Sequence, residues 1–203
     1  MDVSGFKEFV NTRKTEADKI ETAWSKCCYR PSEAELVKAA QLAWEGFLDS
    51  VKFLRMENIS IRDISRGKMK KLASIVSDTV LINNLTHTDQ LGSILVSANC
   101  PKLRLGCDME LSELETRALV SAMSVRLQKV DLQDTTLDIE ELTKYDGQGI
   151  CKVLVFAGDE MRSRHEDRLR RWAADIGWTV NGYCDLLVVK RHRDKNYFIC
   201  DVC

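Results

Sequence analysis

Apolar residues spaced three and four apart predict that the chain begins with helices. The first such stripe runs from Phe6 to Cys27, and this spacing places its members on one face of an amphipathic helix. Tyr29-Arg30-Pro31 ends the helix, because the residue before a proline avoids the helical region of backbone conformations. Ser32, followed three residues later by Glu35, forms a capping-box signal for the start of a second helix.

The second helix is predicted to be long, since its apolar stripe continues from Val37 to Leu54 and brings the helix to about Glu57. Two long amphipathic helices joined by a short turn form an antiparallel hairpin. A third helix is expected from Gly67 to Ser77. We expect Trp44 and Phe47 to be buried where the hairpin meets the next part of the chain, because their stripe needs a partner surface.

From about residue 78 the pattern changes to short β-like runs separated by helical segments. The β-like runs start 23, 27 and 24 residues apart and are Val80-Leu81-Ile82, Leu103-Arg104-Leu105, Val130-Asp131-Leu132 and Leu154-Val155-Phe156. The helical segments that follow them are Thr88–Ala98, Glu113–Met123, Asp138–Tyr145 and Ser163–Ile176. One strand and one helix per period of 20–30 residues is the sequence signature of a solenoid.

The most regular unit is Leu103-x-Leu105-x-x-Asp108-x-x-Leu111, which resembles the leucine-rich repeat of the ribonuclease-inhibitor subtype. In such a unit the leucines point from a strand into the core, and a polar turn residue bonds its side chain to nearby backbone groups. The family favours asparagine or cysteine at that turn, whereas this chain has Leu85, Asp108, Thr135 and Asp159. The resemblance covers roughly residues 78–178 and implies a degenerate array of about four repeats.

These patterns predict an α/β fold that forms one cooperative unit. A helical hairpin in residues 1–77 would cap a short, right-handed strand–helix solenoid with parallel strands in residues 78–190, followed by a tail, 191–203. A further strand at Leu186-Leu187-Val188-Val189 would extend or close the array. An ordinary doubly wound α/β protein remains the alternative, because it also alternates strands with helices.

Composition excludes several classes of protein. Apolar residues make 44% of the chain and charged residues 30%, while there are only ten glycines and two prolines, so a low-complexity or collagen-like chain is excluded. A net charge of −1 gives no overall attraction to nucleic acid, which we do not expect as a partner. The start of the sequence has no apolar run typical of a secretory signal, so we expect a cytoplasmic protein whose eight cysteines are reduced thiols.

The search for catalytic motifs gives little support for an enzyme or a cofactor. The chain contains no phosphate-binding loop, no Gly-x-Gly-x-x-Gly fingerprint, no Gly-x-Ser-x-Gly elbow and no His-Glu-x-x-His pair. It has only three histidines, and no local cysteine–histidine signature for a nucleophilic thiol. We therefore expect no catalytic residues and no cofactor.

The C-terminus contains two candidate sites that compete with a plain strand and a solvated basic tail. Cys200 and Cys203, together with Cys184 and His192, could bind zinc tetrahedrally. Alternatively, Cys200 stands four residues from the end, at the position of a prenylated cysteine, and a basic cluster precedes it. In that case the protein would contact a membrane through its lipidated tail.

Taken together, the sequence predicts a non-enzymatic protein-interaction module with an unidentified partner protein. Ribonuclease-inhibitor-type repeats usually bind proteins, so the resemblance implies binding through the concave strand face. The expected row of partner-facing residues is Leu81, Arg104, Asp131 and Val155, because strand side chains alternate between the core and this face. The alternatives are a membrane-peripheral adaptor that uses the tail, and a small α/β enzyme with its site at the carboxyl ends of the strands.

Overall fold

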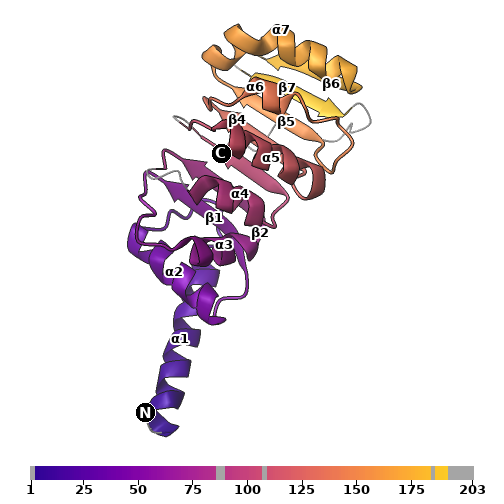
Figure 1. The fold of residues 1–203 in the computed structure, drawn as a ribbon. Coiled ribbons are helices and arrows are strands. Elements are labelled where there is room, and N and C mark those ends of the chain that lie inside the picture. The colour runs from indigo at the N-terminus through magenta and orange to yellow at the C-terminus, as the bar shows by residue number, and fades with distance from the viewer. Residues whose placement is uncertain (1–2, 86–89, 107–108, 184–185, 192–203) are drawn as a thin grey trace.

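A seven-stranded, mostly parallel sheet organises this α/β protein (Figure 1). The computed structural model describes residues 3–85, 90–106, 109–183 and 186–191. Five strands are parallel neighbours in chain order: β1 (Val51–Glu57), β2 (Val76–Asn83), β3 (Lys102–Leu105), β4 (Lys129–Gln133) and β5 (Val153–Ala157). Two antiparallel strands complete the sheet beyond β5, first β7 (Leu186–Arg191) and then β6 (Trp178–Tyr183) at the edge. The prediction that the four β-like runs pair in parallel and in chain order is confirmed.

Helices follow the strands and contact one another in the same order. They are α1 (Val3–Ala23), α2 (Glu33–Glu45), α3 (Arg66–Ser74), α4 (Leu91–Ser97), α5 (Glu113–Val125), α6 (Ile139–Leu142) and α7 (Asp159–Asp175). Contacts run from α2 to α3, α4, α5 and α6 in turn. The buried residues of these helices join those of the strands in a single core, so the helices cover one face of the sheet. Within the described ranges, none of the helices is long and apolar enough to cross a membrane.

Strand positions that face the helices form the centre of this core. Val80, Leu103, Val130 and Leu154 lie side by side in register and are at most 2% exposed. The residues two positions further along these strands are also buried, with exposed fractions of at most 3%: Ile82, Leu105, Leu132 and Phe156. The sheet and the helices are thus held together by apolar side chains from alternate strand residues, as the sequence pattern predicted.

The long second helix predicted to reach Glu57 is wrong. α2 ends at Glu45, because Gly46 adopts a left-handed conformation (φ 79°) and its N–H bonds back to the last helical carbonyls. The chain then enters β1, whose buried residues are Val51, Leu54 and Met56. Val51 and Leu54 continue the spacing of three and four residues that predicts a helix, so the sequence pattern did not distinguish this strand from the helix before it. The sheet therefore begins at Val51, inside the region expected to be helical.

The predicted burial of Trp44 is also wrong, since 59% of its surface is exposed. α2 buries a different stripe, composed of Leu36, Ala39, Ala40, Leu42 and Ala43. The aromatic ring that fills this end of the core is Trp24, which is 2% exposed. Phe47 is partly buried and meets Phe9 of α1 edge to face, with 6.3 Å between the ring centroids.

The N-terminal end of the sheet is covered by the segment that follows α1. The backbone N–H of Phe53 in β1 donates to the carbonyl of Trp24 at 3.1 Å, and the Arg55 guanidinium donates to the carbonyl of Cys27 at 3.3 Å. These bonds satisfy part of the outer edge of β1, which would otherwise be free to pair with another strand. The segment after α1 thus covers part of the outer edge of β1, and Trp44 takes no part in these contacts.

Candidate functional site

The face of the sheet opposite the helices carries the row of residues predicted from the sequence. Leu81 pairs with Arg104, Arg104 with Asp131, and Asp131 with Val155, so the four side chains lie on neighbouring strands of one face. We call this surface the open face, because no described helix packs on it. The row is longer than predicted, since Val188 of β7 pairs with Val155.

The first strand adds Arg55 to the other end of the row, where it pairs with Leu81. Sequence reasoning missed this residue because β1 was taken as helix. The guanidinium of Arg55 lies 2.8 Å from the carboxylate of Glu57, which Arg30 also contacts at 3.0 Å. The alternation of apolar and charged residues in Leu54-Arg55-Met56-Glu57 was the available sequence signal for a strand.

Asp131 is the most unusual group on the open face. Its Oδ2 lies 3.8 Å from Nε of Arg104, beyond hydrogen-bond distance, and its Oδ1 is buried without a hydrogen-bond partner in the described part of the chain. Burial raises the pKa of the Asp131 carboxyl above its ordinary value, while the charges of Arg104 and Lys129 lower it in part. The open face therefore holds a carboxylate with an unused acceptor.

The two halves of the open face differ in character. Beside Asp131, the half formed by β5 and β7 is apolar, and Val153, Val155 and Val188 are 3%, 8% and 4% exposed. They form a cluster separate from the main core, with Leu186 packed against it. The half formed by β2 to β4 carries polar and charged side chains instead, among them Lys102 and Lys129, which pair in register.

The turns at the carboxyl ends of the strands share an uncommon backbone conformation. Asn58, Asn84 and Asp134 each follow a strand directly and have φ values of 51°, 46° and 46°. Asn and Asp tolerate this left-handed region better than other residues that carry a Cβ atom. The Asn84 side chain donates to Oδ1 of Asn58 at 2.8 Å, which links two successive turns.

Thr135 ties two further turns together. Its buried hydroxyl lies 3.2 to 3.3 Å from three backbone carbonyls, those of Leu105, Gly106 and Gln133. The sequence analysis predicted such a bond from the polar turn residue of a repeat. Asp108, the turn residue of the preceding unit, lies outside the described residues, and so does the Asp159 side chain.

The described thiols and phenol near the core are poor nucleophiles. Burial raises the pKa of both Cys100 and Cys151, the latter to about 12, so these thiols stay protonated at neutral pH. Burial likewise raises the pKa of Tyr145 to about 12. Among the described residues, no group of histidine, cysteine and acidic side chains is arranged to hold a metal ion. The zinc candidates Cys184, His192, Cys200 and Cys203, and the lipidation candidate Cys200, lie outside the described residues.

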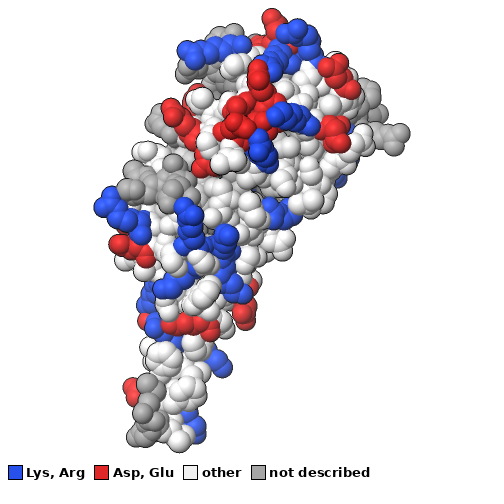
Figure 2. Space-filling view, viewed as in Figure 1, with Lys and Arg blue, Asp and Glu red and all other residues white. Residues whose placement is uncertain are grey.

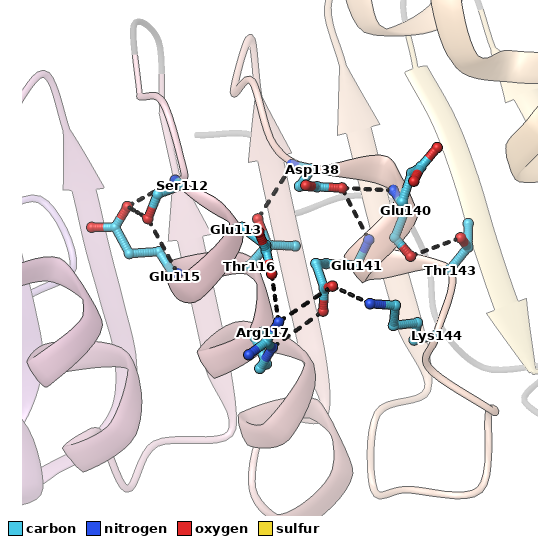
Figure 3. A network of polar contacts seen from close by, with 10 residues as sticks. All are labelled: Ser112, Glu113, Glu115, Thr116, Arg117, Asp138, Glu140, Glu141, Thr143 and Lys144. Atoms are coloured by element: carbon cyan, nitrogen blue, oxygen red, sulfur yellow. Dashed lines mark hydrogen bonds and ion pairs between the residues drawn. The ribbon is translucent and has the colours of Figure 1, made fainter.

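A charged network joins α5 to α6 on the helical side (Figure 3). Glu141, which is 6% exposed, accepts from Arg117 at 3.3 Å and also pairs with Lys144. These two cations hold the pKa of the Glu141 carboxyl below its ordinary value. Asp138 caps α6 with its carboxylate, and its N–H donates to Thr116 of α5 at 3.3 Å. Because the charges compensate one another, the network stabilises helix packing rather than presenting a reactive group.

Among the described residues, the row predicted from the sequence therefore lies on the open face, with Asp131 at its centre. Arg104 stands on one side of this carboxylate and the valine cluster on the other. No protein-family description matches the chain, and comparisons with curated proteins and with solved structures also find no match.

Proposed function

We propose that the chain is a non-enzymatic protein-interaction module that binds a partner protein through the open face. The observation that carries the proposal is the continuous row from Leu81 to Val155, which crosses four parallel strands on the face left free by the described helices. A parallel sheet is normally covered on both faces, because its strands are buried on both sides. A sheet face that the described helices leave free is a natural surface for a partner.

A short solenoid of the leucine-rich-repeat kind is the architecture that best accounts for these features. The parallel strands follow chain order, and from α2 to α6 each helix contacts the helix of the next unit. The left-handed turns recur after β1, β2 and β4, and Thr135 bonds to the carbonyls of the neighbouring unit. In solenoids the stacked strands form an extended surface whose outward side chains contact partners.

The chemistry of the open face favours a partner segment that combines apolar and hydrogen-bond-donating groups. Interfaces bind through a few buried anchors surrounded by a polar rim. The valine cluster makes the neighbouring half of the face apolar, with side chains that are at most 8% exposed. Asp131 Oδ1 supplies an acceptor that lacks a donor within the described structure. The partly exposed side chains of Arg104 and Asp131 supply charged groups for the rim beside the apolar half.

The test combines site-specific cross-linking with charge reversal. A photo-cross-linking residue at Leu81 should capture a defined partner from cells, and Arg104→Glu should abolish that capture. Arg168→Glu, on the outer side of α7, is the matched control and should leave it unchanged. A purified partner must then bind the wild-type chain more than about tenfold tighter than the Arg104→Glu variant, a difference of about 1.4 kcal/mol. Equal binding by the two charge-reversal variants would refute the open face as the site.

A further inference from the structure

A second surface stands apart from the open face, at the N-terminal end of the helical layer. Five basic residues lie within residues 62–71, which contain a single acidic residue, Asp63. Three of the five are the lysines of α3, at positions 68, 70 and 71. Figure 2 shows Lys and Arg side chains gathered over α3, whereas acidic side chains gather over the α5–α6 region. We call Trp44, Lys68, Lys70 and Lys71 the α3 surface.

The three lysines are available to an external ligand. α3 turns Met69, Leu72 and Ala73 into the core, which leaves Lys70 and Lys71 exposed and Lys68 half-buried. None of the ion pairs found among the described residues uses these three ammonium groups. Their positive charge is therefore not neutralised by the described part of the fold.

The exposed Trp44 lies directly beside these charges. Its ring is 3.4 Å from the position that a Cβ atom would occupy at Gly67, in the first turn of α3. Lys71 is four residues after Gly67, so it stands one helical turn along the same side of α3. The α3 surface thus combines a large amphipathic ring, 59% exposed, with lysines on long flexible stems.

We propose that the α3 surface binds the anionic surface of a lipid bilayer. Tryptophan is enriched at the membrane–water interface, and clustered lysines are attracted by acidic headgroups. Lysine is depleted at the core of protein–protein interfaces, which makes an acidic protein patch a poorer fit. The open face lies on the opposite side of the sheet, so this inference does not depend on the proposed partner protein.

The binding experiment uses the full chain and vesicles of phosphatidylcholine with or without about 30% phosphatidylserine. We expect binding only with phosphatidylserine, and weaker binding at higher salt. Replacing the three α3 lysines by glutamine should weaken binding by about 100-fold, at about fivefold for each charge. The matched control replaces Lys7, Lys14 and Lys19, exposed lysines of α1, and should weaken it far less. Equal losses in both variants would overturn the proposal, as would tighter binding to duplex DNA or RNA than to the vesicles.

Tryptophan fluorescence gives a second readout that needs no lysine variant. Trp24, Trp172 and Trp178 are 2%, 5% and 5% exposed, so Trp44 alone responds strongly to a change of solvent. On phosphatidylserine vesicles its emission should shift to the blue and resist quenching by acrylamide, and Trp44→Phe should remove both changes. Binding that leaves Trp44 fully open to the quencher would show that another surface is used, and would overturn the proposal.

Discussion

Replacing Asp131 by asparagine should stabilise the protein at neutral pH. Oδ1 of Asp131 is buried without a partner among the described residues, and such a group costs more when it is charged than when it is neutral, so the neutral amide of asparagine should relieve about 1–2 kcal/mol of this cost. The opposing loss is the contact with Arg104 at 3.8 Å, which is partly exposed and contributes about 0.5 kcal/mol. The free energy of unfolding should therefore rise by about 1 kcal/mol, which raises Tm by about 2–4 °C in a chain of this size.

The stabilisation should depend on pH, because the folded-state pKa of Asp131 is raised. When the pKa of a carboxyl is higher in the folded than in the unfolded state, the protonated group does not destabilise the folded state at a pH below its unfolded-state pKa. The free energy of unfolding then falls as the pH rises through the folded-state pKa, because the buried group becomes charged. The difference in free energy of unfolding between the Asp131→Asn variant and the wild type should thus be largest at pH 7 and should decrease as the solution is acidified.

Urea denaturation across this pH range measures the gap directly. Asp175→Asn, the same change at an exposed position at the end of α7, is the control and should change stability by less than about 0.5 kcal/mol. The reasoning is refuted if Asp131→Asn destabilises the chain at pH 7, or if its effect is independent of pH.

Three further substitutions test the packing and the turns by urea or thermal denaturation. Trp24→Ala should cost about 3–5 kcal/mol because Trp24 is 2% exposed, whereas Trp44→Ala should cost less than about 1 kcal/mol; similar losses would contradict the placement of the two rings. Thr135→Val should cost about 1–2 kcal/mol through the lost hydroxyl bond, and the exposed Thr136→Val should be nearly neutral. Gly158→Ala should cost about 1–3 kcal/mol, because φ is 114° and the new Cβ would lie 1.8 Å from the Asp134 carboxylate; an equally stable variant would show that this turn relaxes freely.

The strands of the open face could be predicted from the sequence because their signal is local and repeated. Apolar residues two apart, as in Val130 and Leu132, place the residue between them on the opposite face whatever the rest of the fold does. The recurrence of one strand and one helix every 23 to 27 residues then predicted that neighbouring strands pair in chain order. The row from Leu81 to Val155 follows from these two facts alone, and the structure places it as expected.

The first strand and the edge of the sheet could not be found in the same way. Val51 and Leu54 are three residues apart, which fits a helical stripe but not a regular strand, and a register shift between Val51 and Phe53 accompanies the burial of both. Gly46 before them indicated that α2 had ended. β6, at Trp178–Tyr183, was not predicted, because its pairing with β7 is antiparallel and breaks the repeat. The exposure of Trp44 depends on which stripe of α2 meets the core, and tertiary packing decides that choice.

The antiparallel strands β7 and β6 end the run of parallel strands at one side of the sheet. A parallel sheet built from stacked units has no intrinsic end, since each new strand offers the same hydrogen-bonding edge to the next one. Here the outer edge belongs to β6, and β7 separates it from the last parallel strand. A duplicated strand–helix unit could therefore be accommodated between existing parallel strands, as between β3 and β4, but not beyond β6.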